Sequence, residues 1–165
     1  MLHYLEEELE QLRKKIIKMG SLVEEQVEFS FRALFEGNLE LAETVKSRDD
    51  EVDKYDIKID KHCQRIFALT QPVANDLRLI MTALMINSDL ERMGDIAVNI
   101  SERAEDLVDY SDLLKEMRVD EIAVKIPEIN KMSIDSFVNV MLSLLKILLK
   151  LMQKSINLTA LFLIF

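Results

Sequence analysis

The sequence predicts an all-α protein, and three features of its composition and pattern indicate that class. Its 165 residues include only three glycines and two prolines, which leaves little material for turns. Leu, Glu, Lys, Ile and Met are abundant, and these residues favour helices. Apolar residues also recur three and four positions apart over long stretches, the spacing of one helix face. We therefore expect a few long helices joined by short breaks, most simply an antiparallel three-helix bundle.

The first helix is expected over about residues 3–35 and the second over about 39–69. The apolar stripe of the first consists of Leu5, Leu9, Leu12, Ile16, Met19, Val23, Val27, Phe31 and Leu34. Gly37 suits the left-handed position that ends a helix, and Asn38 can cap the next one. In the second helix apolar residues step by seven from Val45 to Ile66, before the segment TQPVAND interrupts the pattern.

The third helix is expected over about residues 75–108, with two apolar seams that contact two neighbours. One seam consists of Ala83, Ile86, Leu90, Met93, Ala97, Ile100, Ala104 and Leu107. The other consists of Val73, Leu77, Ile80, Leu84, Asn87, Glu91, Gly94 and Val98, so it turns polar at its centre. A fourth helix is expected to begin near Val119, with Pro127 inside it or at its edge.

Charge and cysteine content restrict the possible partners. The net charge of −9 repels phosphate backbones, so we expect no nucleic-acid binding and favour cations or basic protein surfaces as partners. The single cysteine, Cys63, excludes an intramolecular disulfide and fits a reducing compartment. Since the chain also starts without a recognisable secretory signal, we expect a cytoplasmic protein.

Acidic residues form two stripes that could meet between helices. Asp49, Asp53, Asp56 and Asp60 follow one another at spacings of four, three and four, and Glu91 and Asp95 lie one turn apart. Four converging carboxylates would suit two or more hard or borderline cations. Two alternatives stay open: the first stripe is a solvated face, or Glu91 pairs with a lysine or arginine of the bundle.

Other candidate ligands are weaker. His3 and His62 are isolated in the sequence, and we expect each to be a surface residue or a hydrogen-bonded one. Cys63 lies on the apolar side of its helix and is expected in the core. The sequence contains no nucleophile–base pair, phosphate loop or dinucleotide motif, so we do not expect an enzyme.

Two segments resemble the PhoU family, the regulators associated with the phosphate-specific ABC transporter. TQPVANDLRLIMTALMINSDLERMGDIAVNISE is similar to that family's Q-P-V-A-x-D-L-R and D-L-E-R-x-G-D region, and SRDDEVDKYD resembles its preceding acidic segment. The resemblance covers about residues 1–139. The family's acidic motif falls on Asp49, Asp53, Glu91 and Asp95.

The resemblance implies a cytoplasmic protein of two three-helix repeats that binds metal ions through those four carboxylates. The expected metal is a multinuclear iron cluster, or zinc or manganese. It also implies action on the transporter ATPase and on a phosphate-sensing histidine kinase, as a negative regulator of phosphate-starvation genes; we expect a homodimer. In this chain, residues 1–110 would form the first bundle and residues 111–139 the start of an incomplete second repeat, with one helix.

Residues 140–165 depart from the family pattern. This tail is apolar, with only Lys146, Lys150 and Lys154 charged, and its uncharged run of 11 residues after Lys154 is too short to span a membrane. An amphipathic helix on a membrane surface stays open.

A shifted reading frame offers another explanation of the tail. With Val140 encoded by GTG and suitable synonymous codons after it, a shift of one nucleotide spells DVELAKNIAETDAEVDKLY. That string aligns without a gap on NLELAETVKSRDDEVDKYD, which starts at Asn38. We therefore interpret the tail as an out-of-frame or truncated remnant, a hypothesis that the nucleotide sequence of the gene tests.

The leading functional hypothesis is thus a metal-binding regulatory adaptor of phosphate uptake. The alternatives are a metal-free helical scaffold that docks a basic protein and a truncated product without function.

Overall fold

The structure is a computed structural model that describes residues 2–72 and 74–139. The described chain is helical, with α1 Leu2–Glu36, α2 Leu39–Leu69, α3 Ala74–Glu102, α4 Ala104–Leu107, the 3₁₀ turn η1 Val108–Tyr110, α5 Ser111–Glu116 and α6 Val119–Val138. No strand occurs in these two ranges. The all-α prediction is confirmed; Val73 and the tail at 140–165 lie outside the described residues, and their predicted roles stay predictions.

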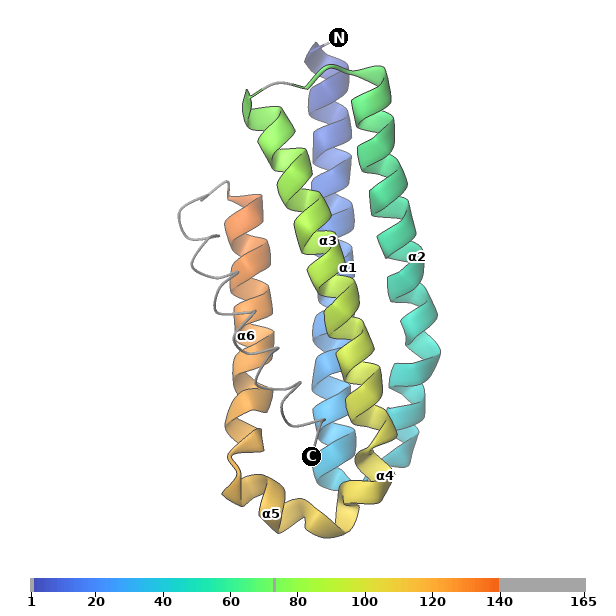
Figure 1. Ribbon diagram of the computed structural model, residues 1–165, viewed down its shortest axis with the longest axis vertical. Coiled ribbons are helices and arrows are strands. Elements are labelled where there is room, and N and C mark those ends of the chain that lie inside the picture. Colours follow the sequence, from blue (N-terminus) through green and yellow to red (C-terminus); the bar gives the residue numbers. More distant parts are fainter. Residues whose placement is uncertain (1, 73, 140–165) are drawn as a thin grey trace.

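Three long helices run side by side and alternate in direction (Figure 1). Each of α1, α2 and α3 packs against the other two. The short elements α4, η1 and α5 turn the chain at one end, and α6 returns antiparallel along α1 (Figure 1). This is the predicted antiparallel three-helix bundle with one further helix beside it.

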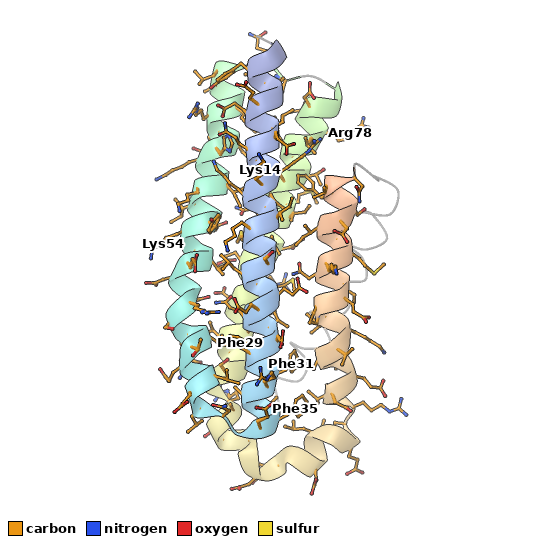
Figure 2. All side chains as sticks on the ribbon, turned by 180° about the vertical axis from the view of Figure 1, so that it is seen from behind. Lys14, Phe29, Phe31, Phe35, Lys54 and Arg78 are labelled. Carbon is orange, nitrogen blue, oxygen red and sulfur yellow. The ribbon has the colours of Figure 1, made fainter. Side chains whose placement is uncertain are left out.

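The core is built on the apolar stripe of α1. Four of its central residues have no exposed surface: Leu12, Ile16, Met19 and Val23. Near the C-terminal end of α1 the rings of Phe31 and Phe35 stack with their centroids 6.4 Å apart (Figure 2). Burial of apolar area stabilises the fold by roughly 25 cal/mol per Å², so this stripe is the main contact surface for the other helices.

Local signals set the first turn as expected. Gly37 has φ 63°, in the left-handed region that glycine enters without strain. Asn38 caps α2, and its side-chain Oδ1 accepts a hydrogen bond from the backbone N–H of Leu41 at 3.2 Å.

The third helix differs from its prediction in two respects. It ends at Glu102, because the N–H of Arg103 donates to the carbonyl of Ile100, three residues back, which tightens the turn before α4. In the second seam Ile80 is buried as expected, but Leu77 is 41% exposed. Met81 and Met85 share that exposed face, which α1 and α2 do not cover.

The fourth helix begins at Val119 as predicted and contains Pro127. It packs on α1 where Gly20 leaves room for the side chain of Ile134. Nearby, Asn130 Nδ2 donates to the carbonyl of Gly20 at 3.2 Å. Ile134 and Phe137 belong to the same core as α1 to α3, so α6 packs on the first bundle. The assignment of α6 to a second repeat stays a prediction.

A buried polar network joins α1 to α2. Lys15 Nζ donates to His62 Nδ1 at 2.8 Å, and His62 Nε2 donates to Glu8 Oε2 at 2.7 Å. Arg65 Nη2 donates both to Glu8 Oε1 at 2.9 Å and to Tyr4 Oη at 3.0 Å. Both ring nitrogens of His62 are therefore occupied, which confirms the expectation of a hydrogen-bonded histidine.

This network shifts the pKa values of its members, and those of His62 and Glu8 bear on its response to acid. Burial, reinforced by the charge of Lys15, lowers the pKa of His62 despite the opposing hydrogen bond with Glu8. Burial alone would raise the pKa of Glu8, but the hydrogen bond from His62 and the charge of Arg65 outweigh it and lower that pKa.

We predict that acid destabilises the bundle through His62. Because the folded pKa of His62 lies below its ordinary value of 6.5, the unfolded chain binds more protons there, and the free energy of unfolding falls as the pH drops below that value. The Tm of the wild type should fall by a few degrees more than that of His62→Gln between pH 7.5 and 5.5. Measurement by circular dichroism above pH 5.5 avoids the titration of Glu8, and parallel profiles for the two proteins would contradict the prediction.

Candidate metal centre

The acidic stripes lie where α2 faces α3. Val45, Val52 and Ile59 turn the other side of α2 into the core. Their heptad spacing leaves Asp49 and Asp56 half-buried at the edge of the interface and Asp53 exposed beside them. On α3, Glu91 is half-buried and Asp95 is exposed.

The carboxylates of the two helices act on one another. Burial raises the pKa of Glu91 first, and the charges of Asp95, Asp56, Asp53 and Asp49 raise it further. The pKa of Asp49 is raised in the same way, by burial and then by Asp53 and Asp95. The structure thus brings the four predicted residues into one electrostatic group, together with Asp56, which belongs to the predicted stripe but not to the predicted ligands.

Within the described ranges, no lysine or arginine forms an ion pair with any of the four predicted ligands. Two lysines of α2 lie elsewhere: Lys54 extends away from the bundle (Figure 2), and Lys58 lies 4.9 Å from the ring centroid of Tyr55. The salt-bridge alternative for Glu91 is therefore not found. The solvated-face alternative describes Asp53 but not the half-buried Asp49.

Two buried amides border this acidic group. Asn87, one turn before Glu91, is 2% exposed, and its Nδ2 donates to Asp56 Oδ1 at 2.6 Å. Gln26 of α1 is also 2% exposed, and its Nε2 donates to the carbonyl of Val45 at 3.4 Å. The Gln26 side chain also hydrogen-bonds to the carboxylate of Asp49, which opposes the rise of that carboxyl's pKa. Among the residues that the structure describes, the Oδ1 of Asn87 and the Oε1 of Gln26 have no hydrogen-bond partner.

Gly94 allows the helices to approach at this point. A Cβ at this position would lie 3.2 Å from Gln26 Oε1, 3.3 Å from Val52 Cγ1 and 3.6 Å from Asp49 Oδ1. The first two distances are tighter than ordinary van der Waals contact, so a larger residue would push α3 away from α1 and α2.

These residues fit a hard cation by donor type and charge. Every donor is a carboxylate or amide oxygen, the ligand class of hard cations, and no ion pair in the described part of the chain balances the four predicted ligands. As they are placed, no three His, Cys, Asp or Glu side chains in the described part of the chain stand close enough to hold a metal ion. Asp53 and Asp95 are exposed, and exposed side chains change rotamer rapidly, so their carboxylates can move relative to those of the half-buried Asp49 and Glu91.

The other candidate ligands are accounted for. Cys63 is fully buried in the core, as predicted, and burial raises the pKa of its thiol to about 12. It is therefore a thiol and not a thiolate ligand. The side chain of His3 lies outside the described residues.

The comparisons with known proteins assign the chain to a family. The PhoU domain model matches residues 16–104, more than half of the chain. The chain belongs to the PhoU family. The match covers most of α1, all of α2 and α3, and the predicted residues Asp49, Asp53, Glu91 and Asp95.

Individual PhoU proteins show the same similarity. The chain is 41% identical over 131 residues to the phosphate-specific transport system accessory protein PhoU homolog of Aquifex aeolicus, covering 79% of this chain and 59% of that protein. It is 38% identical over 97 residues to the corresponding protein of Escherichia coli K12, covering 59% and 40%. The crystal structure of PhoU from Pseudomonas aeruginosa superposes with a TM-score of 0.76 at 34% identity, covering 81% of this chain and 65% of the other. The chain thus spans about two fifths to two thirds of the length of these PhoU proteins.

One further finding concerns membranes. Among the helices that the structure describes, none is long and apolar enough to cross a bilayer.

We predict that neutralising two acidic residues stabilises the metal-free protein. Removal of the repulsion in Asp49→Asn/Glu91→Gln should raise the Tm in EDTA at pH 7 by about 2–5 °C, since like-charged pairs destabilise by a few tenths of a kcal/mol each and about 1 kcal/mol shifts Tm by several degrees. The control Glu28→Gln/Glu51→Gln removes two charges from exposed positions of α1 and α2 and should change the Tm by less. A lower Tm for the first variant than for the control would show that the four carboxylates do not repel one another appreciably.

Proposed function

We propose that this PhoU-family chain is a metal-binding regulatory adaptor of phosphate uptake and phosphate-starvation signalling, and not an enzyme. The observation that carries the proposal is the group of carboxylates from α2 and α3 that no lysine or arginine of the described chain balances. Its placement inside the matched PhoU domain links that group to relatives named phosphate-specific transport system accessory proteins.

In this proposal Asp49, Asp53, Glu91 and Asp95 hold the metal. A multinuclear iron cluster, or zinc or manganese ions, would supply the positive charge that offsets the repulsion between the helices. The half-buried Asp49 and Glu91 orient the site from its floor, while the exposed Asp53 and Asp95 close over it.

The partners proposed are the ATPase of the phosphate ABC transporter and a phosphate-sensing histidine kinase, on which the protein acts as a negative regulator. The name shared by the relatives supports a transporter partner. A cytoplasmic location follows from the proposal, because an ABC-transporter ATPase and a histidine kinase would both use ATP there. The homodimer expected from the sequence stays a prediction.

The metal proposal predicts that protein purified from metal-replete cells carries at least one transition-metal ion per chain. Elemental analysis should show that Asp49→Asn/Glu91→Gln loses this metal, while Glu28→Gln/Glu51→Gln retains it. A wild-type protein without metal would overturn the proposal and favour the alternative, an acidic metal-free scaffold that docks a basic protein.

The regulatory proposal predicts repression in a bacterium that lacks its own PhoU protein. Expression of this chain should lower the activity of a phosphate-starvation promoter in high phosphate, and Asp49→Asn/Glu91→Gln should lower it less at equal protein level. If the wild-type chain accumulates in folded form and the promoter stays fully active, the chain is the truncated product without function considered above.

A further inference from the structure

The polar network between α1 and α2 contains a row of three groups that the metal proposal does not use. Lys15 Nζ lies 2.8 Å from His62 Nδ1, and His62 Nε2 lies 2.7 Å from Glu8 Oε2. An amine, an imidazole and a carboxylate are thus joined by two consecutive hydrogen bonds. The same order of nucleophile, base and orienting group is typical of sites of covalent chemistry. Lys15 and His62 are 47 positions apart in the sequence, so only the packing of the helices reveals the pair.

His62 is oriented as a base toward Lys15. Arg65 Nη2 donates to Glu8 Oε1 at 2.9 Å, which holds the carboxylate in place, and the other oxygen of Glu8 accepts from His62 Nε2. With its proton on Nε2, the neutral ring presents the lone pair of Nδ1 to the amine. The side chains of His62 and Glu8 are 3% and 6% exposed, so water hardly competes for these positions. His62 can therefore take a proton from the nitrogen of Lys15.

The surroundings of Lys15 favour its neutral, nucleophilic form. Burial lowers the pKa of Lys15 and outweighs the opposing charge of Glu8. The positive charges of Arg65 and Lys58 lower that pKa further. A charge on Cys63 would raise it, but the pKa of about 12 of the thiol keeps Cys63 neutral. Lys15 is half-buried and not enclosed, so a small reagent can reach it, and the neighbouring cations favour an anionic reagent.

We propose that Lys15 is a modification site, whose amine takes the acyl group of an acyl phosphate. This inference goes beyond the proposed regulatory function and does not depend on metal binding. Nζ attacks the carbonyl carbon with its lone pair and forms a C–N bond, and the C–O bond to the phosphate breaks, with its electron pair leaving on the phosphate oxygen. The proton lost from Nζ passes to His62 Nδ1 and then to the released phosphate, while Glu8 stabilises the transient imidazolium.

The modification would change the network that produces it. The product is an Nε-acyl lysine, an amide that keeps the acyl group, so one group is transferred per chain and the protein is modified without turnover. Acylation removes the positive charge of Lys15. Since this charge helps to lower the pKa of His62, acylation brings the folded pKa of His62 closer to its ordinary value and reduces the loss of stability in acid.

The test treats the full chain with acetyl phosphate at pH 8 and follows each lysine by peptide mass spectrometry. Lys15 should be acetylated about 10-fold faster than Lys14, the exposed lysine beside it on α1 (Figure 2). In His62→Gln the amide oxygen can still accept from the ammonium and the amide nitrogen can still donate to Glu8, but the amide takes up no proton. The rate at Lys15 should then fall about 10-fold, while the rate at Lys14 stays unchanged.

Two further measurements separate the chemistry from packing. Glu8→Gln keeps an acceptor for His62 Nε2 but removes the negative charge, so Lys15 should react a few-fold more slowly, again with Lys14 unchanged. In the wild type, the rate at Lys15 should reach its plateau below pH 10.5, the ordinary pKa of a lysine amine.

Equal rates at Lys15 and Lys14 in the wild type would show that Lys15 is not activated, and the inference would be wrong. It would also be wrong if His62→Gln stays folded by circular dichroism and Lys15 keeps its wild-type rate. If His62→Gln unfolds, the other two measurements decide: an unchanged rate in Glu8→Gln together with a plateau at or above pH 10.5 overturns the inference.

Discussion

Close packing of α1 against its neighbours is the constraint on which the rest of the molecule depends. The fully buried residues between Leu12 and Val23 give α2 and α3 a common surface, and interiors packed at crystal-like density leave little freedom in how helices sit. Once both helices lie on α1, their own contact is determined. The carboxylates of Asp49 and Glu91 are then held in one electrostatic group, although their charges oppose the approach.

The bundle contains two clusters of polar side chains, one between α1 and α2 and one between α2 and α3. They differ in whether their charges are balanced. In the network of Glu8, His62, Lys15 and Arg65 each charged or hydrogen-bonding group meets a partner of suitable type, so it is complete without a ligand. The acidic group around Asp49 and Glu91 accepts hydrogen bonds from the amides of Gln26 and Asn87, but the charges that act on Asp49 and Glu91 in the described part of the chain are all negative. This contrast within one fold separates a structural polar network from a candidate binding site.

Features governed by neighbouring residues could be predicted from the sequence. The stripe of α1, the left-handed Gly37 and the cap by Asn38 depend on contacts within a few positions, and the heptad step in α2 identified its buried side. Features that depend on distant partners were missed. The exposure of Leu77 and the pairing of Glu8 with His62, 54 residues apart, are decided by tertiary packing.

The candidate site shows the same division. The spacing of the acidic residues predicted one stripe on each of two helices, since residues four apart share a helix face. The resemblance to the PhoU family then selected Asp49, Asp53, Glu91 and Asp95 as the predicted ligands. Gln26 was missed, although a polar residue at a stripe position of α1 was a signal that could have found it. Its significance depends on the close approach at Gly94, which pattern alone does not reveal.

The docking of α6 on α1 also affects how the chain folds. Its hydrogen bond from Asn130 to Gly20 closes a loop of 110 residues, whereas α1, α2 and α3 are joined in sequence by short turns. Contacts between near neighbours form fast and distant ones form late, so the three long helices should assemble first and α6 should dock afterwards. The reverse order then holds for opening: α6 is the segment whose detachment leaves the remaining core intact, so its amides should exchange with solvent hydrogen before those of α1 to α3.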